Sequence, residues 1–375
     1  MRIIFLFIAL LSTVCLQAQT VRDALIFSEM QPIVNARSMG VGNALGALGA
    51  DLSMASTNPA GLGVYRRAEL GFSMGLFNDA TTTDLFGNST RDRFSRIQFG
   101  NVGLVLPTRV RRLGSDWKFV NFGITFNRLA NYGRDFSFRG VTTGSRVSAF
   151  ADRASGLSVN QLDPYGEEMA YTAFLMDQDR LGNYIPNGGI TENTALLRSQ
   201  TVSRTGGVNE LGLSLSSNYK NKLYLGFTVG IDFLNFREER YYEEIDQDDQ
   251  IDFDNMTFQE NRQVTGTGIN LKLGMIYRLN KMFRVGLSVH TPTGYRLTDS
   301  YNSALTADIV YADTLRSTDF SIDGFDPLIL RHDLATPWVV SGSLGAIFGR
   351  RGFLGLDVEY LDFSTATFSL LEADQ

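Results

Sequence analysis

Apolar and polar residues alternate along most of the chain after about residue 67. The clearest case runs from Leu223 to Phe233, eleven residues in which Leu, Phe, Val or Ile occupies every second position and Tyr, Gly, Thr or Asp lies between. A period of two places successive side chains on opposite faces of a strand. The length also matches the roughly 9 to 11 residues that a tilted strand needs to cross a membrane. This segment predicts a strand with one apolar and one small or polar face.

The same alternation predicts further strands. They lie at residues 70–76, 120–126, 211–215, 269–277, 283–289, 340–348 and 354–360. Charged and polar residues such as Arg284, His290, Asp357 and Glu359 fall on the face opposite the apolar one. The segment 94–106 is apolar but changes phase near Gly100, which indicates a β-bulge. Together these segments give nine predicted strands.

The joins between these strands alternate in length. Short joins lie at residues 108–116, 218–221, 280–281 and 349–351, and long polar joins at 79–93, 131–206, 238–257 and 291–337. Short turns on one side and long loops on the other are typical of outer-membrane barrels, whose long loops lie outside the cell. A soluble β-sandwich gives no reason for such asymmetry. We therefore predict an all-β, antiparallel transmembrane β-barrel over residues 67–375.

The predicted barrel does not close. After Phe368 the chain ends in Leu370-Leu371-Glu372-Ala373-Asp374-Gln375, without a terminal aromatic strand. An odd, unclosed sheet would leave two bare edges in lipid, where unpaired backbone groups are costly. Either the barrel is incomplete at the C-terminus or the strand count is wrong, and the sequence leaves both alternatives open.

The first residues predict export. Arg2 precedes an apolar run from Ile3 to Leu11, and Ala18 provides a small residue for cleavage, so residues 1–18 are predicted to be a secretory signal peptide. The mean hydropathy is −0.06, and no later segment is long and apolar enough for a transmembrane helix. These features exclude a helical membrane protein and favour the cell outer membrane of a Gram-negative bacterium.

Residues for common catalytic and metal sites are scarce. Cys15, the only cysteine, lies in the predicted signal peptide, and only two histidines occur, His290 and His332. Ser288 and His290 share a strand face but stand roughly 6.5 to 7 Å apart, which is too far for a hydrogen bond. We expect no enzyme, no metal and no cofactor. The acidic run 243–254 lacks the glycine of a calcium loop, and a net charge of −6 gives no reason to expect nucleic acid binding.

A glycine-rich segment lies between the signal peptide and the first strand, within residues 19–66. It contains Asn35 to Asp51, and its apolar Val41, Leu45, Leu48 and Leu52 recur at helical spacings, which favours packing against another surface. The segment ends in Asn58-Pro59-Ala60-Gly61, where Pro59 biases Asn58 away from helix and Gly61 permits unusual backbone angles. It is predicted either to fold into the lumen as a plug or to lie outside as a tail.

The order of this glycine-rich run and the Asn58-Pro59-Ala60-Gly61-Leu62 motif resembles the N-terminal hatch of the FadL/TodX outer-membrane transporters of long-chain fatty acids and aromatic hydrocarbons. Val289-His290-Thr291-Pro292-Thr293 and Ala335-Thr336-Pro337-Trp338 are similar to the same family, so the resemblance spans about Asn35 to Ser364. It implies a barrel of about 14 strands plugged by the hatch, with about five strands beyond Gln375.

The resemblance also implies a transport route. Ligand would meet an apolar groove in the outer loops, enter the lumen, and leave sideways into the membrane after the hatch shifts. The candidate groove lies in the loop 131–206, on a predicted helix that carries Met169, Tyr171, Phe174 and Leu175. The alternative for these four residues is a small core that only stabilises the loop.

The predicted partners are a hydrophobic small molecule, outer-membrane lipid and lipopolysaccharide, and the predicted state is a monomer. Transport of a hydrophobic compound such as a long-chain fatty acid would be passive, since apolar burial alone contributes roughly 0.8 kcal/mol per methylene. A polar diffusion porin and a structural or adhesive barrel remain as alternative functions.

Overall fold

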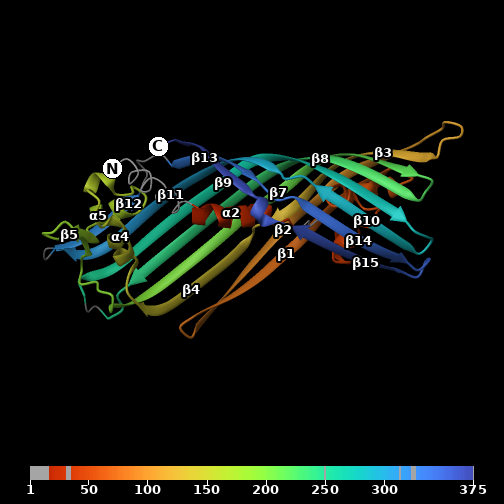
Figure 1. Cartoon of the computed structure of the whole chain (residues 1–375). Coiled ribbons are helices and arrows are strands. Elements are labelled where there is room, and N and C mark those ends of the chain that lie inside the picture. Colours follow the sequence, from red (N-terminus) through yellow and green to blue (C-terminus); the bar gives the residue numbers. More distant parts are fainter. Residues whose placement is uncertain (1–16, 31–34, 249–250, 312–313, 322–326, 375) are drawn as a thin grey trace.

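The structure, a computed structural model, describes residues 17–30, 35–248, 251–311, 314–321 and 327–374 (Figure 1). Residues 1–16 of the predicted signal peptide lie outside this part of the chain, so the cleavage site stays a prediction.

One antiparallel sheet forms the wall of the molecule. Along its main path the strands follow in the order β1(Glu69–Leu85), β2(Asn88–Arg109), β3(Trp117–Asn131), β7(Ala195–Tyr219), β8(Leu223–Ile245), β9(Phe253–Arg278), β10(Phe283–His290), β14(Val339–Ile347) and β15(Phe353–Leu361). These nine strands correspond in order to the nine predicted ones. The prediction of an all-β antiparallel fold is therefore confirmed.

Several strands continue beyond an interruption. β4(Arg134–Thr143) extends β3, β11(Gly294–Tyr311) extends β10, β13(Leu328–Ala335) precedes β14, and β16(Thr367–Asp374) extends β15 after η4(Phe363–Thr365). β12(Thr314–Ser321) pairs with the end of β11. Each continuation pairs with a strand of the same wall, so the sheet is much longer along its strands than the apolar segments alone indicate.

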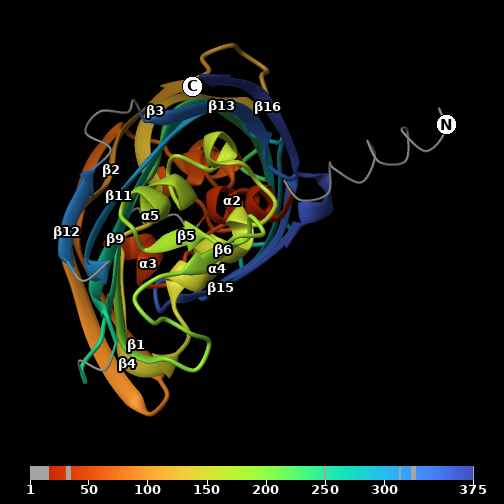
Figure 2. The same cartoon turned by 90° about the vertical axis from the view of Figure 1, so that its left-hand side faces the viewer.

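The sheet curls around the N-terminal elements (Figure 2). These are α2(Gln17–Ser28), α3(Ala36–Met39), η1(Leu52–Ala55) and η2(Pro59–Val64). At one end of the wall, α4(Arg146–Ala154), η3(Val159–Gln161), α5(Glu167–Thr172), β5(Met176–Gln178) and β6(Tyr184–Pro186) form a small cap (Figures 1 and 2). Among the described strands, β1 and β15 are the edges of the main path.

The two faces of the wall have opposite character. On β8, Leu225, Phe227 and Phe233 are exposed on the outer face, whereas Thr228 and Asp232 are fully buried on the inner face. This inverts the usual distribution in a soluble protein, where apolar side chains face the core. The polar inner face is buried because the interior of the curled sheet is filled.

The change of phase near Gly100 is a β-bulge, as predicted. Met74 pairs with Phe99 and Ser73 with Asn101, so Gly100 has no partner across the ladder. The extra residue keeps apolar side chains on the outer face both before and after it, since a strand without it would reverse its faces at this point.

The predicted short joins are confirmed, but three of the long loops are mostly strand. β1 and β2 pair up to Leu85 and Asn88, and β8 and β9 pair up to Ile245 and Asn255. Beyond the apolar band the outer face is mostly polar, and on β8 and β9 apolar residues such as Leu234, Phe236 and Val264 lie on the inner face. The alternation seen within the band therefore does not continue in the same phase. The ladder persists because backbone hydrogen bonds do not depend on side-chain polarity. Among the described residues beyond the apolar band, only 144–194 form a large separate loop structure.

Deleting Gly100 should strongly destabilise the wall. Without the bulge, residues 88–99 would present the wrong face to the interior, and the free energy of unfolding should fall by about 2 kcal/mol or more. Urea unfolding of the refolded full chain in detergent micelles measures this. Gly75→Ala is the control, because a Cβ there meets open space. A deletion no more harmful than the control would contradict the role of the bulge.

Candidate functional site: a plug seated on glycine pairs

The turn at Asn58 begins the most enclosed part of the N-terminal segment. Asn58 caps η2 by accepting a hydrogen bond from Ala60 N at 3.2 Å, and its Nδ2 donates to Gly46 O at 2.7 Å. The same Nδ2 lies 3.4 Å from Met275 O of β9, so Asn58 also reaches the wall. Pro59 suits the first helical position because it needs no backbone N–H donor there. Asn58, Pro59, Ala60 and Gly61 are all buried.

Glycines of the wall make room for this turn. Gly226 on β8 and Gly274 on β9 are direct cross-strand partners. A Cβ built on Gly226 collides with the backbone of Pro59 and Ala60, and one built on Gly274 collides with Asn58 Oδ1. Only glycine permits a second backbone to approach a strand this closely.

Two other cross-strand glycine pairs support the plug in the same way. Gly71 pairs with Gly103, and both lie under Leu52. Gly345 pairs with Gly355, and these contact Leu48 and the Ala44 carbonyl respectively. The sequence alone did not predict that these glycines make room for the plug. The available signal was the recurrence of glycine at inward positions of predicted strands.

Polar side chains of the wall satisfy the plug's backbone. Asn121 Nδ2 donates to Leu62 O at 2.6 Å and to Tyr65 O at 3.0 Å, and Arg284 donates to Leu48 O at 2.8 Å. His290 Nε2 lies 2.7 Å from Thr57 O, and Asp357 accepts from Gly46 N at 3.0 Å. The inward residues Arg284, His290 and Asp357 thus hold the plug, since buried backbone groups need such partners.

The predicted packing residues of the plug belong to one cluster. Leu45, Leu48 and Leu52 are buried together with Met54 and Leu62, and Val41 packs partly buried against them. They do not lie on one helix, although their spacing is helical. α3 ends at Met39, and left-handed backbone angles follow at Gly42, Asn43, Gly49 and Ala50. These positions interrupt the helix and fold the segment into turns.

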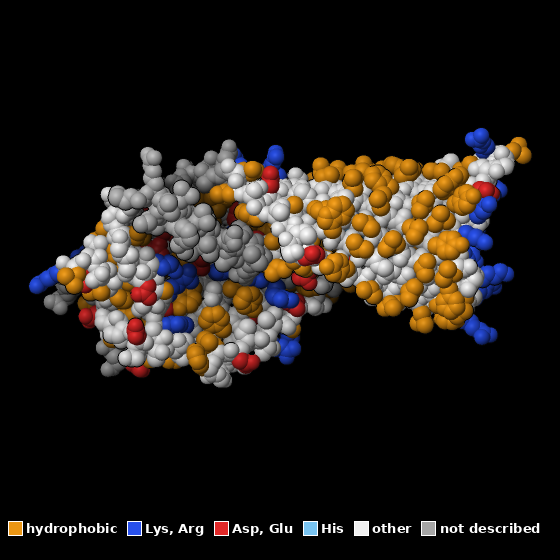
Figure 3. Space-filling model, viewed as in Figure 1, with side chains coloured by type: hydrophobic (Ala, Val, Ile, Leu, Met, Phe, Trp, Pro, Cys, Tyr) orange, Lys and Arg blue, Asp and Glu red, His pale blue; other side chains and the backbone are white. Residues whose placement is uncertain are grey.

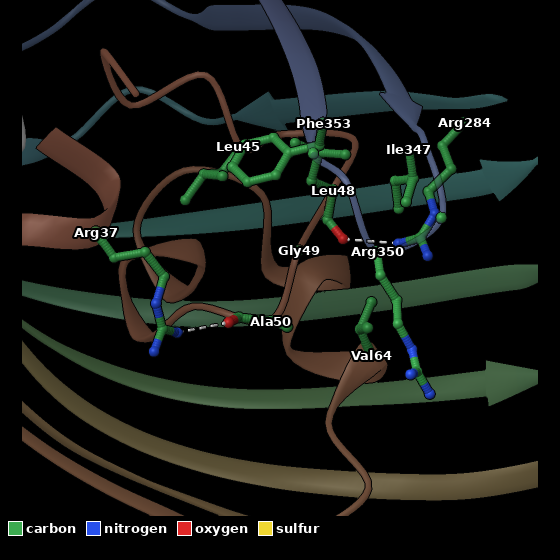
Figure 4. A pocket seen from close by; sticks show the side chains of 12 residues that line it. Arg37, Leu45, Leu48, Gly49, Ala50, Val64, Arg284, Ile347, Arg350 and Phe353 are labelled. Atoms are coloured by element: carbon green, nitrogen blue, oxygen red, sulfur yellow. Dashed lines mark hydrogen bonds between the residues drawn. The ribbon is translucent and has the colours of Figure 1, made fainter. Parts of the chain in front are cut away.

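A cavity of about 390 Å³ lies beside the plug, near the short turn between β14 and β15 (Figure 4). Its walls include Leu45, Leu48, Val64 and Phe353, with Arg37 and Arg284 at its edge. Arg284 binds the Leu48 carbonyl and Arg37 the Ala50 carbonyl (Figure 4). Burial, together with the nearby carboxylates of Glu69 and Asp51, raises the pKa of Tyr65, whose hydroxyl donates a hydrogen bond to Glu69.

The lumen beyond the plug is polar and then apolar. Lys272 contacts Glu210 and donates to Asn270 at 2.8 Å, while Asp232 accepts from Tyr295 at 2.8 Å and from Asn270 at 3.2 Å. This chain of buried ions and amides crosses the inner face from β7 to β11. It is followed by an apolar cluster around Phe27 of α2.

The four candidate groove residues are placed differently from one another. Met169 and Leu175 are fully buried in the core of the end cap, and Tyr171 packs against that core. Phe174 is 36% exposed, with the Arg316 guanidinium 5.4 Å from its ring centroid. Met169 and Leu175 therefore stabilise the cap and do not line an open groove, so of these four residues only Phe174 offers an exposed apolar side chain.

Within the described part of the chain, no helix is long and apolar enough to cross a membrane. Over the same residues, no group of three or more His, Cys, Asp or Glu side chains is arranged to hold a metal ion.

No family profile matches the chain, and no curated protein matches its sequence. Among solved structures, the chain is similar to the CymD monoaromatic hydrocarbon channel, at 10% identity and a TM-score of 0.31. The match covers 90% of this chain and 94% of that channel. A likeness this low carries no argument, so the resemblance to the FadL/TodX family stays a prediction.

Gly226→Ala should loosen the plug. The added methyl meets backbone atoms of Pro59 and Ala60, and such overpacking should lower the free energy of unfolding by about 1–3 kcal/mol. Gly342→Ala on β14 is the matched control, because its Cβ meets nothing within 4 Å, and a change within about 0.5 kcal/mol is expected. Denaturant unfolding of both variants measures the difference, and equal values would show that the close contact is unimportant.

Proposed function

We propose that the chain forms a plugged outer-membrane channel for passive uptake of hydrophobic small molecules, such as long-chain fatty acids. Residues 19–66 act as the hatch and residues 67–375 as the wall of a monomer. The hatch moves to admit ligand, which then leaves sideways into the membrane. The observation that carries the proposal is the plug itself, whose backbone is seated on the wall at Gly226, Gly274 and Gly355.

The outer surface supports a position in lipid. Exposed apolar side chains form a band over the half of the molecule that ends in the short turns, and Lys and Arg side chains gather where the band stops (Figure 3). The band includes Leu70, Phe72, Leu76, Phe122, Ile124, Leu215, Phe227, Leu273, Leu287, Leu344 and Leu356. Outer-membrane barrels present such a band to lipid and polar ends to water.

The filled lumen supports a hydrophobic ligand over a polar solute. A diffusion porin needs a water-filled channel, whereas here the plug and the Phe27 cluster occupy the interior. An apolar ligand gains roughly 0.8 kcal/mol for each methylene that it buries, so it can bind in such a lumen from dilute solution.

The wall has a candidate side exit. Three adjacent strands are interrupted at one level, at residues 291–293, 336–338 and 362–366. A cavity of about 440 Å³ lies at this level and is lined by Ile269, which is exposed on the outside, and by Tyr295 and Leu334, which belong to the lumen cluster. The cavity therefore joins outer and inner side chains, which favours sideways release here.

Leu273→Arg tests the contact with lipid. Leu273 is exposed in the middle of the outer apolar band, where Arg should destabilise the folded barrel in phospholipid vesicles by about 2–4 kcal/mol. Leu279→Arg is the matched control, because Leu279 is similarly exposed but lies in the short turn, where a loss of about 0–1 kcal/mol is expected. Denaturant titration of the vesicle-embedded protein measures both, and equal effects in the two variants would place the band outside lipid.

A reversible lock tests the hatch. A Cβ built on Gly46 lies against Ser343 Oγ of β14, so Gly46→Cys combined with Ser343→Cys should bring two sulfur atoms within disulfide reach. We expect oxidised cells to lose uptake of radiolabelled oleate and to regain it after reduction. The two single variants are the controls, and they should respond to neither treatment.

The outcomes separate the candidate functions. Uptake of oleate but not of a small sugar by porin-deficient cells supports the hydrophobic channel. Uptake of sugar indicates a porin, and uptake of neither indicates a structural or adhesive barrel. Unchanged oleate uptake in the locked protein would disprove hatch movement while leaving the channel itself intact.

A further inference from the structure

The helix α2 lies inside the wall, beyond the plug (Figures 1 and 2). One of its side chains, Phe27, is completely buried. The ring meets Phe236 edge-on at a centroid distance of 5.6 Å and Tyr132 at 6.0 Å, and these two rings also meet edge-on. Aliphatic side chains complete an apolar cage around it, namely Leu129, Val208, Leu234, Val264, Leu297 and Leu334.

A second side chain of α2 forms an ion pair at the same level. Asp23 accepts from Arg262 Nη1 of β9 at 3.0 Å. Arg262 also donates from Nε to Asp299 of β11, at 2.9 and 3.1 Å to its two carboxylate oxygens. The guanidinium is therefore fixed by the wall through Asp299, and its remaining donors hold the carboxylate of α2.

Asp23 and Phe27 are four residues apart and lie on one face of the helix, about 5–6 Å between Cβ atoms. The helix therefore presents a carboxylate and, one turn away, an aromatic ring. This is the chemical pattern of a small amphiphilic acid. Within the described chain, Tyr132 Oη and both ring nitrogens of His332 are buried beside this cluster without a hydrogen-bond partner, so further polar contacts are open to a ligand.

We propose that Arg262 and the Phe27 cage form a binding site for an apolar monocarboxylate, and that α2 occupies this site as an internal competitor. The proposal rests on the proposed channel function and names the chemical class of its ligand. The ligand carboxylate takes the place of Asp23 on Arg262, and its apolar body takes the place of Phe27. The exchange leaves the number of charges at the site unchanged, because one carboxylate replaces another beside the Arg262–Asp299 pair.

The geometry makes the helix and the ligand competitors. Two groups cannot fill one cage, so ligand binds only to the fraction of molecules in which α2 has withdrawn. The apparent dissociation constant is then the intrinsic one divided by that fraction. Weakening the hold of α2 must therefore tighten ligand binding. If Asp23 and Phe27 instead contacted the ligand, their removal would weaken ligand binding.

The first arm of the test identifies the site. Titration calorimetry on the full chain in phospholipid nanodiscs compares 4-phenylbutyrate with the neutral 4-phenylbutanol. Arg262→Gln combined with Asp299→Asn and Asp23→Asn removes all three charges, so no lone buried charge is left. Compared with Asp23→Asn alone, in which α2 has lost the same ion pair, this variant should weaken binding of the acid at least tenfold and binding of the alcohol less than twofold. Heat-dependent mobility on gels shows that the barrel has folded in each variant.

The second arm identifies the competitor. Asp23→Asn combined with Phe27→Ala should tighten 4-phenylbutyrate binding at least tenfold. Leu25→Ala is the matched control, because Leu25 lies on the same helix, is 47% exposed and is outside the cage, and it should leave the affinity unchanged. Unchanged affinity in the double variant overturns the role of α2, and unchanged selectivity for the acid after the Arg262 change overturns the site.

Failure of this inference differs from failure of the channel. If cells take up oleate while neither arm changes affinity, the channel stands and the site is wrong. If both arms behave as expected but no apolar probe is taken up, the site stands and the transport function is wrong.

Discussion

The arrangement of this protein depends on how closely the plug's backbone approaches the inner face of the sheet. Three pairs of directly opposed glycines on neighbouring strands remove side chains from the wall at the places where the plug lies. Glycine in a strand normally weakens it, since it contributes no packing and gains freedom in the unfolded chain. Here the lost side chains are replaced by the plug, whose Leu48, Leu52 and Pro59 fill the vacated space.

The filled interior explains why polar and apolar residues exchange places relative to a soluble fold. Inward Asn121, Arg284 and His290 can be buried because the turns of the plug present carbonyl groups to them. A buried polar group without such a partner would be destabilising, so the polar inner face and the irregular plug stabilise each other. The outer face, free of this requirement, carries apolar side chains.

The interior has two layers that differ in how firmly they are held. The plug contacts the wall through its backbone as well as its side chains. These backbone contacts extend from Gly46, whose N–H binds Asp357, to Tyr65, whose carbonyl binds Asn121. Among the described contacts, α2 and the adjoining Met30 are held through side chains, by the Asp23–Arg262 ion pair, the Phe27 ring and the partly buried Ala24, Ile26 and Met30. A segment anchored by a few side chains can withdraw at lower energy than one integrated along its backbone. This difference is the physical basis for treating α2 as the displaceable element.

The residues alone were enough to predict the strands within the apolar band, their antiparallel order, the bulge at Gly100 and the short turns. A strand with lipid or solvent on one face and a filled interior on the other must alternate, and alternation is visible in the residues. The alternation did not reveal that β1, β2, β8 and β9 extend far beyond the band. There the outer face becomes mostly polar, and apolar residues such as Leu234 and Phe236 lie on the inner face, so the phase of the pattern breaks. The residues also indicated a packed N-terminal segment around Asn58, but not where that segment lies.

The folded chain was needed to place Pro59 over Gly226 and Gly274, to bury Met169 and Leu175 in the end cap, and to bring Asp23 to Arg262. Those contacts join residues far apart in the chain, and their partners are chosen by the curvature of the sheet and not by any local pattern.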